Sequence, residues 1–324
     1  MTSRRGAGAL FVLLALAALG VLAPPAGAKE LRIAMVLWRG ETDAEKGFRE
    51  GLKELGHSAQ YVVMNANQDR AELGRLLREE LKPRLETFDY VYAYGTTVAL
   101  AAKTIVQDKV PLIFNIVVDP VGAGVVPSLE RSGSNIAGVT NAVPLKLQLE
   151  SALSVFPIKR LGLFFNPREK NAMLIRDKVG EVAKPLGIEV IDLRSPPAQE
   201  MLQENLQKLR DRSIAVDAVY LPADSFLVSN AKLVGAELRA AHVKSIAAIE
   251  TFVDQGALMG VVPQYDELGR AAATLVHRHL GGQRLQEMPV LSDPQPELRI
   301  NAATSRALGL TIPDALRKRA KLVE

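Results

Sequence analysis

A glycine and two adjacent threonines, Gly95, Thr96 and Thr97, stand between an apolar run and a run of small helix-forming residues. Residues 88–94 predict a buried strand, and residues 98–103 predict the start of a helix. The N-terminus of a helix presents unpaired N–H groups and a partial positive charge, and both attract anions. Gly95 lets a ligand approach the backbone, and the two hydroxyls add donors that suit a carboxylate. One threonine would be enough to cap the helix, so the second favours contact with a ligand over capping alone.

Polar side chains also follow the other predicted strands. In open parallel sheets, ligands bind beyond the carboxyl ends of the strands. The candidates at these ends are Asp119 and Asn141 in the first half of the chain, and Asn166, Asp224 and Glu250 in the second half. Hydroxyls on one side of a cleft and carboxylates near both sides would accept a zwitterion. Each carboxylate also has a simpler interpretation: Asp119 braces a turn, Asp224 caps a helix, and Glu250 is exposed to water.

The single tryptophan, Trp38, ends the first predicted strand in the segment VLWRGETDAEKGF. A ring at this position is either an aromatic wall for an apolar part of a ligand or packing between two parts of the fold. The sequence favours neither interpretation over the other.

Strands and helices alternate along the chain, which predicts βαβ units and parallel sheets. In the first half we expect strands at residues 31–38, 59–64, 88–94, 110–118 and 136–140, with helices at 45–55 and 70–81. The pattern then restarts, with strands at 160–165, 189–193, 218–221 and 245–249 and a helix at 171–185. A Leu-Gly pair ends the first helix of each half, at Gly56 and at Gly187. The repeat suggests two similar lobes.

The predicted fold class is therefore α/β, with two similar doubly wound parallel-sheet lobes joined by a multi-strand hinge. We expect lobe 1 to comprise residues 29–143 plus about 263–288, and lobe 2 to comprise 146–260 plus about 291–324. Pro144, Pro263 and the proline-rich stretch 289–296 are candidate crossing points between the lobes. The strongly amphipathic helix at 265–280 is assigned back to the first lobe.

The first 28 residues have the layout of a secretory signal peptide: a basic start, an apolar stretch at 9–23 and a small-residue exit at 26–28. The apolar stretch is shorter than the ~20 residues that a membrane-spanning helix needs. We predict cleavage after Ala28 and a periplasmic location; the alternative is an uncleaved anchor. The chain contains no cysteine, which excludes a lipid anchor at the cleavage site, a disulfide framework and a thiolate metal site.

Motifs of known enzyme classes are absent from the sequence. The GAGVV segment at Gly122 lacks the third glycine of a dinucleotide-binding loop, and neither a phosphate-binding loop nor a Gly-x-Ser-x-Gly elbow occurs. His277 and His279 stand two apart on a predicted helix and face different sides, so they form no helical metal pair. No basic stripe with interleaved aromatics predicts nucleic-acid binding. We expect no cofactor, no metal and no catalysis; the alternative is a periplasmic hydrolase of unrecognised type that uses Asp119 or Glu250.

Six segments of the chain share one resemblance. They are GFREGLKELGH, YAYGTTVALAAKT, VPLIFNIVVDPVGAGVV, SNIAGVTN, RLGLFFNP and RINAATSRALGLTIPDAL. Together they resemble the exported substrate-binding proteins of ABC importers, in the type I periplasmic binding protein family and its uncharacterised group with tryptophan- and tyrosine-binding members. The resemblance implies a ligand cleft that contains Gly95, Thr96 and Thr97, with Asp119 beside it. It also implies a membrane permease and an ATPase as partners. The loop at residues 38–41 departs from the family's shorter, apolar start, so ligand identity does not transfer.

The residues and the resemblance together predict a monomeric receptor that hinges shut on a small ligand. An amino acid is expected, with an aromatic or large apolar side chain preferred. The other possibility is a ligand sensor that docks on a membrane receptor, because transport and sensing use the same closing cleft.

Overall fold

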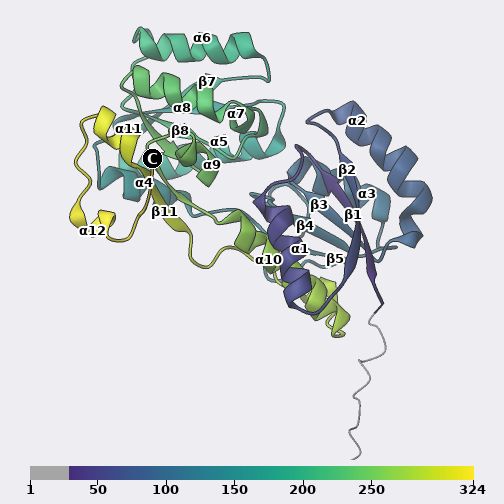
Figure 1. Ribbon diagram of the computed structural model, residues 1–324. Helices are drawn as coiled ribbons and strands as arrows, with labels where there is room; N and C mark the ends of the chain where they lie inside the picture. The colour runs from purple at the N-terminus through teal and green to yellow at the C-terminus, as the bar shows by residue number, and fades with distance from the viewer. Residues whose placement is uncertain (1–28) are drawn as a thin grey trace, which may run out of the picture.

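Two α/β lobes lie side by side in the computed structural model, which describes residues 29–324 (Figure 1). The predicted signal peptide at residues 1–28 lies outside the described residues. Each lobe is built around its own β-sheet. None of the helices formed by residues 29–324 combines the length and the apolar character that crossing a bilayer requires.

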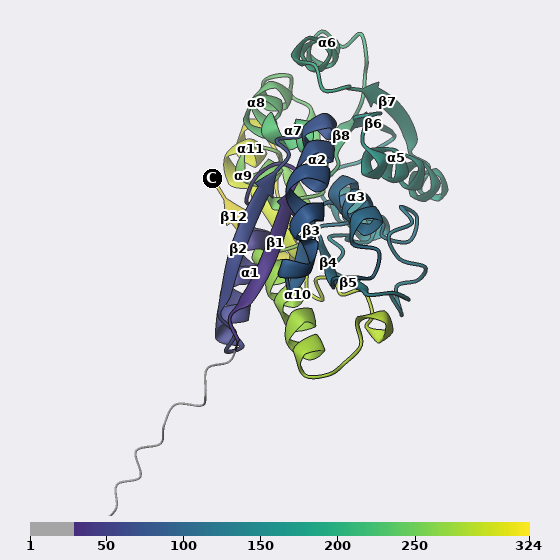
Figure 2. The same ribbon diagram turned by 90° about the vertical axis from the view of Figure 1, so that its right-hand side faces the viewer.

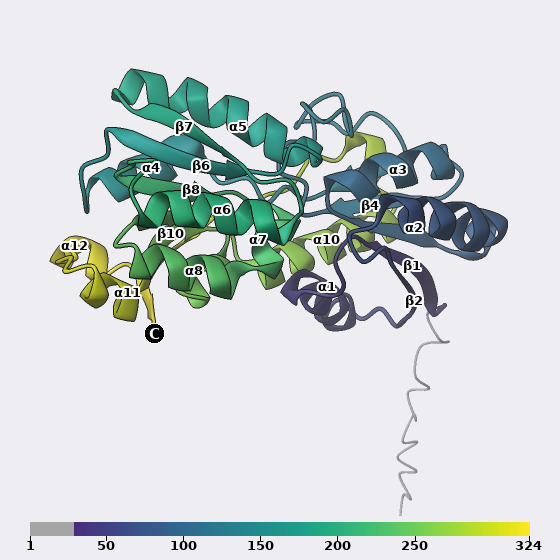
Figure 3. The same ribbon diagram turned by 90° about the horizontal axis from the view of Figure 1, so that it is seen from above.

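The first sheet has five parallel strands in the order β2-β1-β3-β4-β5, and Figure 2 labels all of them. The strands are β1 (Leu31–Leu37), β2 (Ala59–Asn65), β3 (Tyr90–Tyr94), β4 (Leu112–Asn115) and β5 (Ile136–Gly138). The central strands are almost fully buried because helices cover both faces of the sheet. One face is covered by α1 (Asp43–Glu54) and α10 (Tyr265–Leu280), the other by α2 (Arg70–Arg75) and α3 (Thr96–Val106) (Figure 3).

Helix α10 follows a strand of the second lobe, yet it packs against α1 of the first lobe (Figure 1). The two helices approach closely because each has a glycine at the contact. A Cβ atom on Gly47 would lie 2.1 Å from the carbonyl oxygen of Asp266, and one on Gly269 would lie 2.1 Å from that of Ala44. Only glycine fits at such a distance, so these two residues fix α10 onto the first lobe.

The second sheet has seven strands in the order β12-β11-β10-β9-β8-β6-β7. The strands are β6 (Arg160–Phe165), β7 (Glu189–Arg194), β8 (Ala218–Leu221), β9 (Lys244–Ala247), β10 (Met259–Val262), β11 (Glu297–Asn301) and β12 (Lys321–Val323). Strand β11 runs antiparallel to β10, and all other neighbours in this sheet are parallel. Helices α4 (Leu145–Leu153) and α5 (Lys170–Ala183) cover one face, and α6 (Gln199–Arg210) and α8 (Ala231–Ala240) cover the other (Figure 3).

Shorter elements complete the two lobes. They are the π-helical turn η1 (Leu76–Leu81), the 3₁₀ turns η2 (Lys82–Thr87), η3 (Lys184–Leu186) and η4 (Leu285–Glu287), and the helices α7 (Ser225–Ser229), α9 (Glu250–Asp254), α11 (Ala302–Ala307) and α12 (Asp314–Arg317).

The predicted internal repeat corresponds to a repeated unit of structure. Strand order β2-β1-β3 in the first sheet matches β7-β6-β8 in the second. The helix after β1 is followed by Gly56, with φ 82°, and the helix after β6 by Gly187, with φ 71°. Both glycines adopt the left-handed conformation that turns the chain from the helix into the next strand.

The chain passes between the lobes three times: after β5, after β10 and after η4. The first and last of these segments run side by side. The Thr140 N–H donates to the Leu291 carbonyl at 2.8 Å, and the Leu291 N–H donates to the Gly138 carbonyl at 3.0 Å. These paired segments form the multi-strand hinge that the sequence predicts, and the α/β two-lobe fold class is confirmed.

Several predicted elements differ from the structure. The strand expected at residues 110–118 ends at Asn115, because Ile116 has a φ of 57° that no strand contains. The helix expected at 70–81 is α-helical only to Arg75 and continues as η1. Strands β10, β11 and β12, of four, five and three residues, were not predicted.

Candidate functional site

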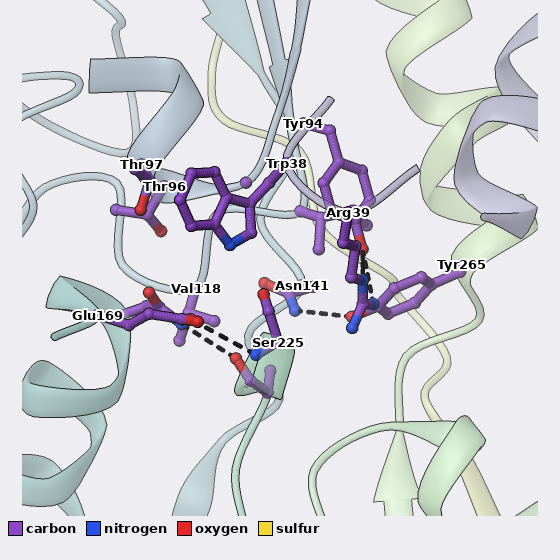
Figure 4. A pocket seen from close by; sticks show the side chains of 14 residues that line it. Trp38, Arg39, Tyr94, Thr96, Thr97, Val118, Asn141, Glu169, Ser225 and Tyr265 are labelled. Atoms are coloured by element: carbon purple, nitrogen blue, oxygen red, sulfur yellow. Dashed lines mark hydrogen bonds between the residues drawn. The ribbon is translucent and has the colours of Figure 1, made fainter. Parts of the chain in front are cut away.

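A pocket lies between the two lobes, beyond the carboxyl ends of the strands (Figure 4). The space between its lining atoms is about 410 Å³, a figure that includes open solvent at the mouth of the pocket. Of the predicted site residues, Trp38, Gly95, Thr96, Thr97 and Asn141 line this pocket. The lining does not include Asp119, Asn166, Asp224 or Glu250. The lining also includes residues that were not predicted, among them Arg39, Tyr94, Glu169, Asn171, Ser225 and Tyr265.

Gly95 and the two threonines form the start of α3, as the sequence suggests. Gly95 is the N-cap residue, with φ 86° and ψ 160°, a conformation that side chains rarely adopt. No side chain of residues 29–324 caps this helix, so the interpretation of a threonine as the cap is wrong. Thr96 is buried and Thr97 is half-buried, and both line the pocket. The helix end therefore presents its free N–H groups and two hydroxyls to whatever occupies the pocket.

Trp38 follows the last residue of β1 and forms the middle of the pocket wall (Figure 4). Its side chain is only 6% exposed. Its indole Nε1 is buried and has no hydrogen-bond partner among the described residues. A buried N–H without a partner is costly, and an acceptor in the pocket would remove that cost. The ring thus lines the pocket and offers it a donor.

Arg39 lies beside Trp38 and was not singled out in the sequence. Its Nε and one terminal nitrogen donate to the hydroxyl of Tyr94, at 3.1 and 2.7 Å. Burial works to lower the pKa of Arg39, but the phenols of Tyr94 and Tyr265, and then the Glu169 carboxylate, raise it more, so the net shift is upward. Arg39 is a permanent cation in the pocket wall.

Asn141 and Tyr265 close the pocket on the hinge side. The Asn141 Nδ2 donates to the Tyr265 hydroxyl at 3.3 Å, while the Asn141 Oδ1 is buried without a partner in the part of the chain that the structure describes. Tyr265 is the first residue of α10, so the same hinge segment that returns α10 to the first lobe also places this phenol in the pocket.

The second lobe contributes a buried carboxylate, Glu169, from the loop between β6 and α5. Its Oε2 accepts from the Asn171 Nδ2 at 3.3 Å and from the Ser225 backbone N–H at 3.5 Å. Burial raises the pKa of Glu169, although these hydrogen bonds and the charge of Arg39 oppose the shift. A sequence signal for Glu169 was present: it ends the segment FFNPRE, three residues after the predicted site residue Asn166.

Two predicted site residues, Asn166 and Asp224, lie behind Glu169 rather than in the pocket lining. The Asn166 N–H donates to the Asp224 carboxylate at 3.1 Å, and the Asn166 amide contacts the Glu169 carboxylate at 3.5 Å. Asp224 also caps α7 by accepting from the Leu227 N–H at 2.9 Å, as its simpler interpretation proposed. Burial, and then the nearby Glu169 charge, raises the pKa of Asp224 to about 7. Asn166 and Asp224 therefore hold Glu169 in place.

Asp119 lies away from the pocket and engages other groups. It accepts from the Gly122 N–H at 2.9 Å, so it braces a turn, and it pairs with Lys178 of α5 at 2.6 Å. Burial opposes ionisation, but Lys178 and the Gly122 N–H lower the pKa of Asp119. Asp119 thus connects the two lobes at their rim.

Glu250 lies on the other side of the hinge, where Arg299 holds it at 3.2 Å. Arg299 also pairs with Asp254 and Glu297, each at 2.6 Å. Burial raises the pKa of Glu250 to about 7 despite Arg299. Glu250 is thus neither solvated, as its simpler interpretation proposed, nor in the pocket lining.

Polar contacts across the cleft show that the lobes are closed on one another. Besides the Asp119–Lys178 pair, the Gln68 amide donates to the Ser229 hydroxyl at 2.9 Å. Lys170 donates to the Ala123 carbonyl at 2.7 Å, and Arg70 donates to the Arg168 carbonyl. Within residues 29–324, no group of three or more histidine, aspartate or glutamate side chains is placed to hold a metal ion.

A family model described as ABC transporter substrate binding protein matches residues 33–324. The match covers most of the chain, so the chain belongs to this family, and the resemblance identified from the sequence is confirmed. The chain is also similar to a protein named Tyrosine-binding protein from Clostridioides difficile (strain R20291). The two are 28% identical over 272 residues, which cover 82% of this chain and 76% of that protein.

Solved structures resemble the fold over 91% of the chain. A conserved domain protein from Vibrio cholerae matches with a TM-score of 0.81 and 23% identity, over 100% of its own chain. An ABC domain in complex with L-Trp from Streptococcus pneumoniae matches with a TM-score of 0.81 and 22% identity, also over 100% of its chain. A ligand-free, open substrate binding protein from Clostridium difficile gives a TM-score of 0.67 and 22% identity over 99% of its chain. At these identities, the similarity establishes the fold.

Proposed function

We propose that this family member is the periplasmic receptor of an ABC importer, and that it closes its two lobes around an amino acid with a large side chain. The observation that carries the proposal is the opposed chemistry of the two pocket walls. The start of α3 offers N–H and hydroxyl donors and a partial positive charge, whereas the second lobe offers the carboxylate of Glu169. An α-amino acid carries a carboxylate for the first and an ammonium for the second.

The positions of these groups fit one amino-acid head. Thr96, Thr97 and Glu169 lie on the same side of the pocket in Figure 4. The α-carboxylate would accept from the threonine hydroxyls and the free N–H groups of α3, and the ammonium would donate to Glu169. Because the two groups belong to different lobes, only the closed form satisfies both, and ligand binding stabilises closure.

The rest of the pocket lining would contact the side chain of the amino acid. Trp38, Ile116 and Val118 supply an aromatic ring and two branched apolar side chains next to the head-group position. These surfaces favour an aromatic or other large side chain that is apolar along most of its length. The similar protein named Tyrosine-binding protein, and the similar fold solved in complex with L-Trp, support this choice.

A role in import requires that the two lobes close around the ligand, and it requires no chemical reaction. A receptor needs to enclose its ligand and present the closed form to a membrane permease and its ATPase; it needs no group that attacks a bond. We expect the mature protein to be monomeric, to bind its ligand stoichiometrically and to release it chemically unchanged.

A thermal-shift screen of the mature protein against the common amino acids tests the proposal. A ligand at 100 times its dissociation constant stabilises the bound form by roughly 2.7 kcal/mol, which is an easily measured shift. Calorimetry then compares the best ligand with its deaminated and its decarboxylated analogues, and both should bind far more weakly. Solution scattering should show a more compact protein with ligand. The absence of any amino-acid ligand, or recovery of a converted product over many turnovers, would overturn the proposal.

A further inference from the structure

Arg39 is a pocket cation that the proposed head-group contacts leave without a partner. Its bonds go to the Tyr94 hydroxyl, and its guanidinium lies 5.6 Å from the centre of the Tyr94 ring. Both are contacts with a neutral phenol. No carboxylate of residues 29–324 forms an ion pair with Arg39, although Glu169 acts on it from across the pocket. The pocket therefore holds an arginine whose charge is not compensated at close range.

The position of Arg39 separates it from the proposed head-group contacts. In Figure 4, Arg39, Tyr94 and Tyr265 lie on one side of Trp38, and Thr96, Thr97 and Glu169 lie on the other. An amino-acid head held at the start of α3 would direct its side chain beneath the indole of Trp38 towards the guanidinium. Arg39 then faces the end of the ligand side chain rather than the α-carboxylate.

The groups around Arg39 are mostly donors. The Tyr94 hydroxyl already accepts from Arg39, and the Tyr265 hydroxyl already accepts from Asn141, so each phenol keeps its own O–H proton to donate. The Trp38 Nε1 is a further donor without a partner. Among the side chains of residues 29–324, an unpartnered acceptor at this end is the Asn141 Oδ1. Such a set of donors around a cation recognises an oxygen group with negative charge.

The pairing of charges at close range in the closed pocket leads to the same group. The ligand ammonium pairs with Glu169, and the ligand carboxylate pairs with the positive end of α3. A ligand with a neutral side chain would then remove water from Arg39 without replacing it by an anion, which is unfavourable for a buried charge. If the ligand bound in the reverse orientation, with its head group at Arg39, the start of α3 would face the end of the side chain. That helix end would also favour an anion.

We propose that the natural ligand carries a second anionic group at the end of its side chain, a carboxylate in the simplest case, and that Arg39 binds it. This inference rests on the proposed function and defines the ligand as an amino acid with two acidic groups. The apolar surfaces of Trp38, Ile116 and Val118 would contact the part of the side chain between its two ends.

Matched ligand pairs test the inference on the unaltered protein. Calorimetry would compare 4-carboxyphenylalanine with phenylalanine, and glutamate with glutamine, with tyrosine as a neutral ligand that ends in an oxygen. We expect the acidic member of the pair that fits best to bind at least about tenfold more tightly than its neutral partner, since hydrogen bonds between charged groups are the strong ones. Equal affinities, or tightest binding of phenylalanine or tyrosine, would overturn the inference and leave the proposed function standing. Absence of binding by every amino acid would instead contradict the proposed function.

The variant Arg39→Gln provides the second measurement, with Arg78→Gln, an exposed arginine on η1, as its control. Arg39→Gln should lose the preference for the acidic ligand and bind it at least about tenfold more weakly, while its affinity for the neutral ligand stays the same or rises. A parallel loss for both ligands would show that Arg39 only supports the fold of the pocket, and would overturn the inference. Arg78→Gln should keep the preference.

Discussion

The two walls of the pocket recognise opposite charges and are built in different ways. The first-lobe wall depends on backbone geometry: a glycine with φ 86° starts α3 and leaves its N–H groups free. The second-lobe wall depends on a buried side chain, Glu169, that Asn166, Asn171 and Ser225 hold by hydrogen bonds. The first wall keeps its charge at any pH, whereas the second can take up a proton. One wall is therefore a fixed site for the ligand, and the other makes binding conditional on closure and on pH.

The largest expected effect comes from removing the carboxylate of the second wall. Glu169→Gln keeps the shape of the side chain but leaves the ligand ammonium unpaired in a closed pocket. Breaking one partner of a buried charge pair costs about 3–5 kcal/mol, so calorimetry should show ligand binding reduced by at least a hundredfold. Glu181→Gln, an exposed residue on α5, is the matched control and should bind normally. Wild-type affinity in Glu169→Gln would show that this wall does not bind the ammonium.

A smaller loss is expected from the first wall. Changing Thr96 and Thr97 together to valine removes two hydroxyl donors but leaves the N–H groups of α3 in place. Binding should weaken by about 2–4 kcal/mol, with incomplete additivity between the two bonds. Because neither threonine caps the helix, thermal stability without ligand should change little. Thr104→Val, further along α3, is the control, and an unchanged affinity in the double variant would refute contact between the hydroxyls and the ligand.

The pH dependence should distinguish the walls further. Burial raises the pKa of Glu169, and the pKa of its neighbour Asp224 is raised to about 7. The ammonium binds the ionised form of Glu169, so affinity should fall as the pH drops through the raised pKa of Glu169. Because one proton must leave Glu169 before the ammonium binds, affinity should fall roughly tenfold, or about 1.4 kcal/mol, for each pH unit below that pKa. Calorimetry of the wild type and of Glu169→Gln checks this, because the variant should lose most of the slope.

Stability without ligand should follow pH in the opposite direction. Carboxyls with a raised pKa in the folded state hold a proton that the unfolded chain has already lost, so their contribution is present at low pH and disappears as the pH rises through about 7. Asp224 and Glu250 both belong to this class. Thermal unfolding of the ligand-free protein should therefore show these two groups lowering stability between about pH 4 and 8. A parallel rise of stability and affinity with pH would contradict the assignment.

The smallest effect is expected at the rim, where the walls meet. The Asp119–Lys178 pair crosses the cleft, but the Lys178 side chain is 47% exposed, and such pairs are worth about 0.2–1 kcal/mol. Lys178→Met should weaken binding less than about fivefold, mainly through faster ligand release from a less stable closed form. Lys184→Met, an exposed residue in η3, is the control. A hundredfold loss in Lys178→Met would mean that the rim, not the walls, determines affinity.

The sequence alone determined the fold class and the first-wall elements of the candidate site. Strand and helix periodicities are local, and so is the sequence Gly95-Thr96-Thr97 at the end of an apolar run. The start of α3 was therefore located correctly from neighbouring residues. Trp38 was placed at the end of β1 by the same kind of local pattern, and it lines the pocket.

Which strand-end charges face the pocket depends on contacts made in the folded protein. Asp119, Asp224 and Glu250 all follow strands, as does Glu169, and nothing in the local sequence distinguishes them. Their orientations depend on residues far away in the chain: Asp119 forms an ion pair with Lys178, and Glu250 forms one with Arg299. Glu169 reaches the pocket because Asn166 and Asp224 hold its loop from behind. The direction of a loop side chain is set by partners that are distant in the sequence. The spacing of residues along the chain carries no information about those partners, so it could not reveal the direction.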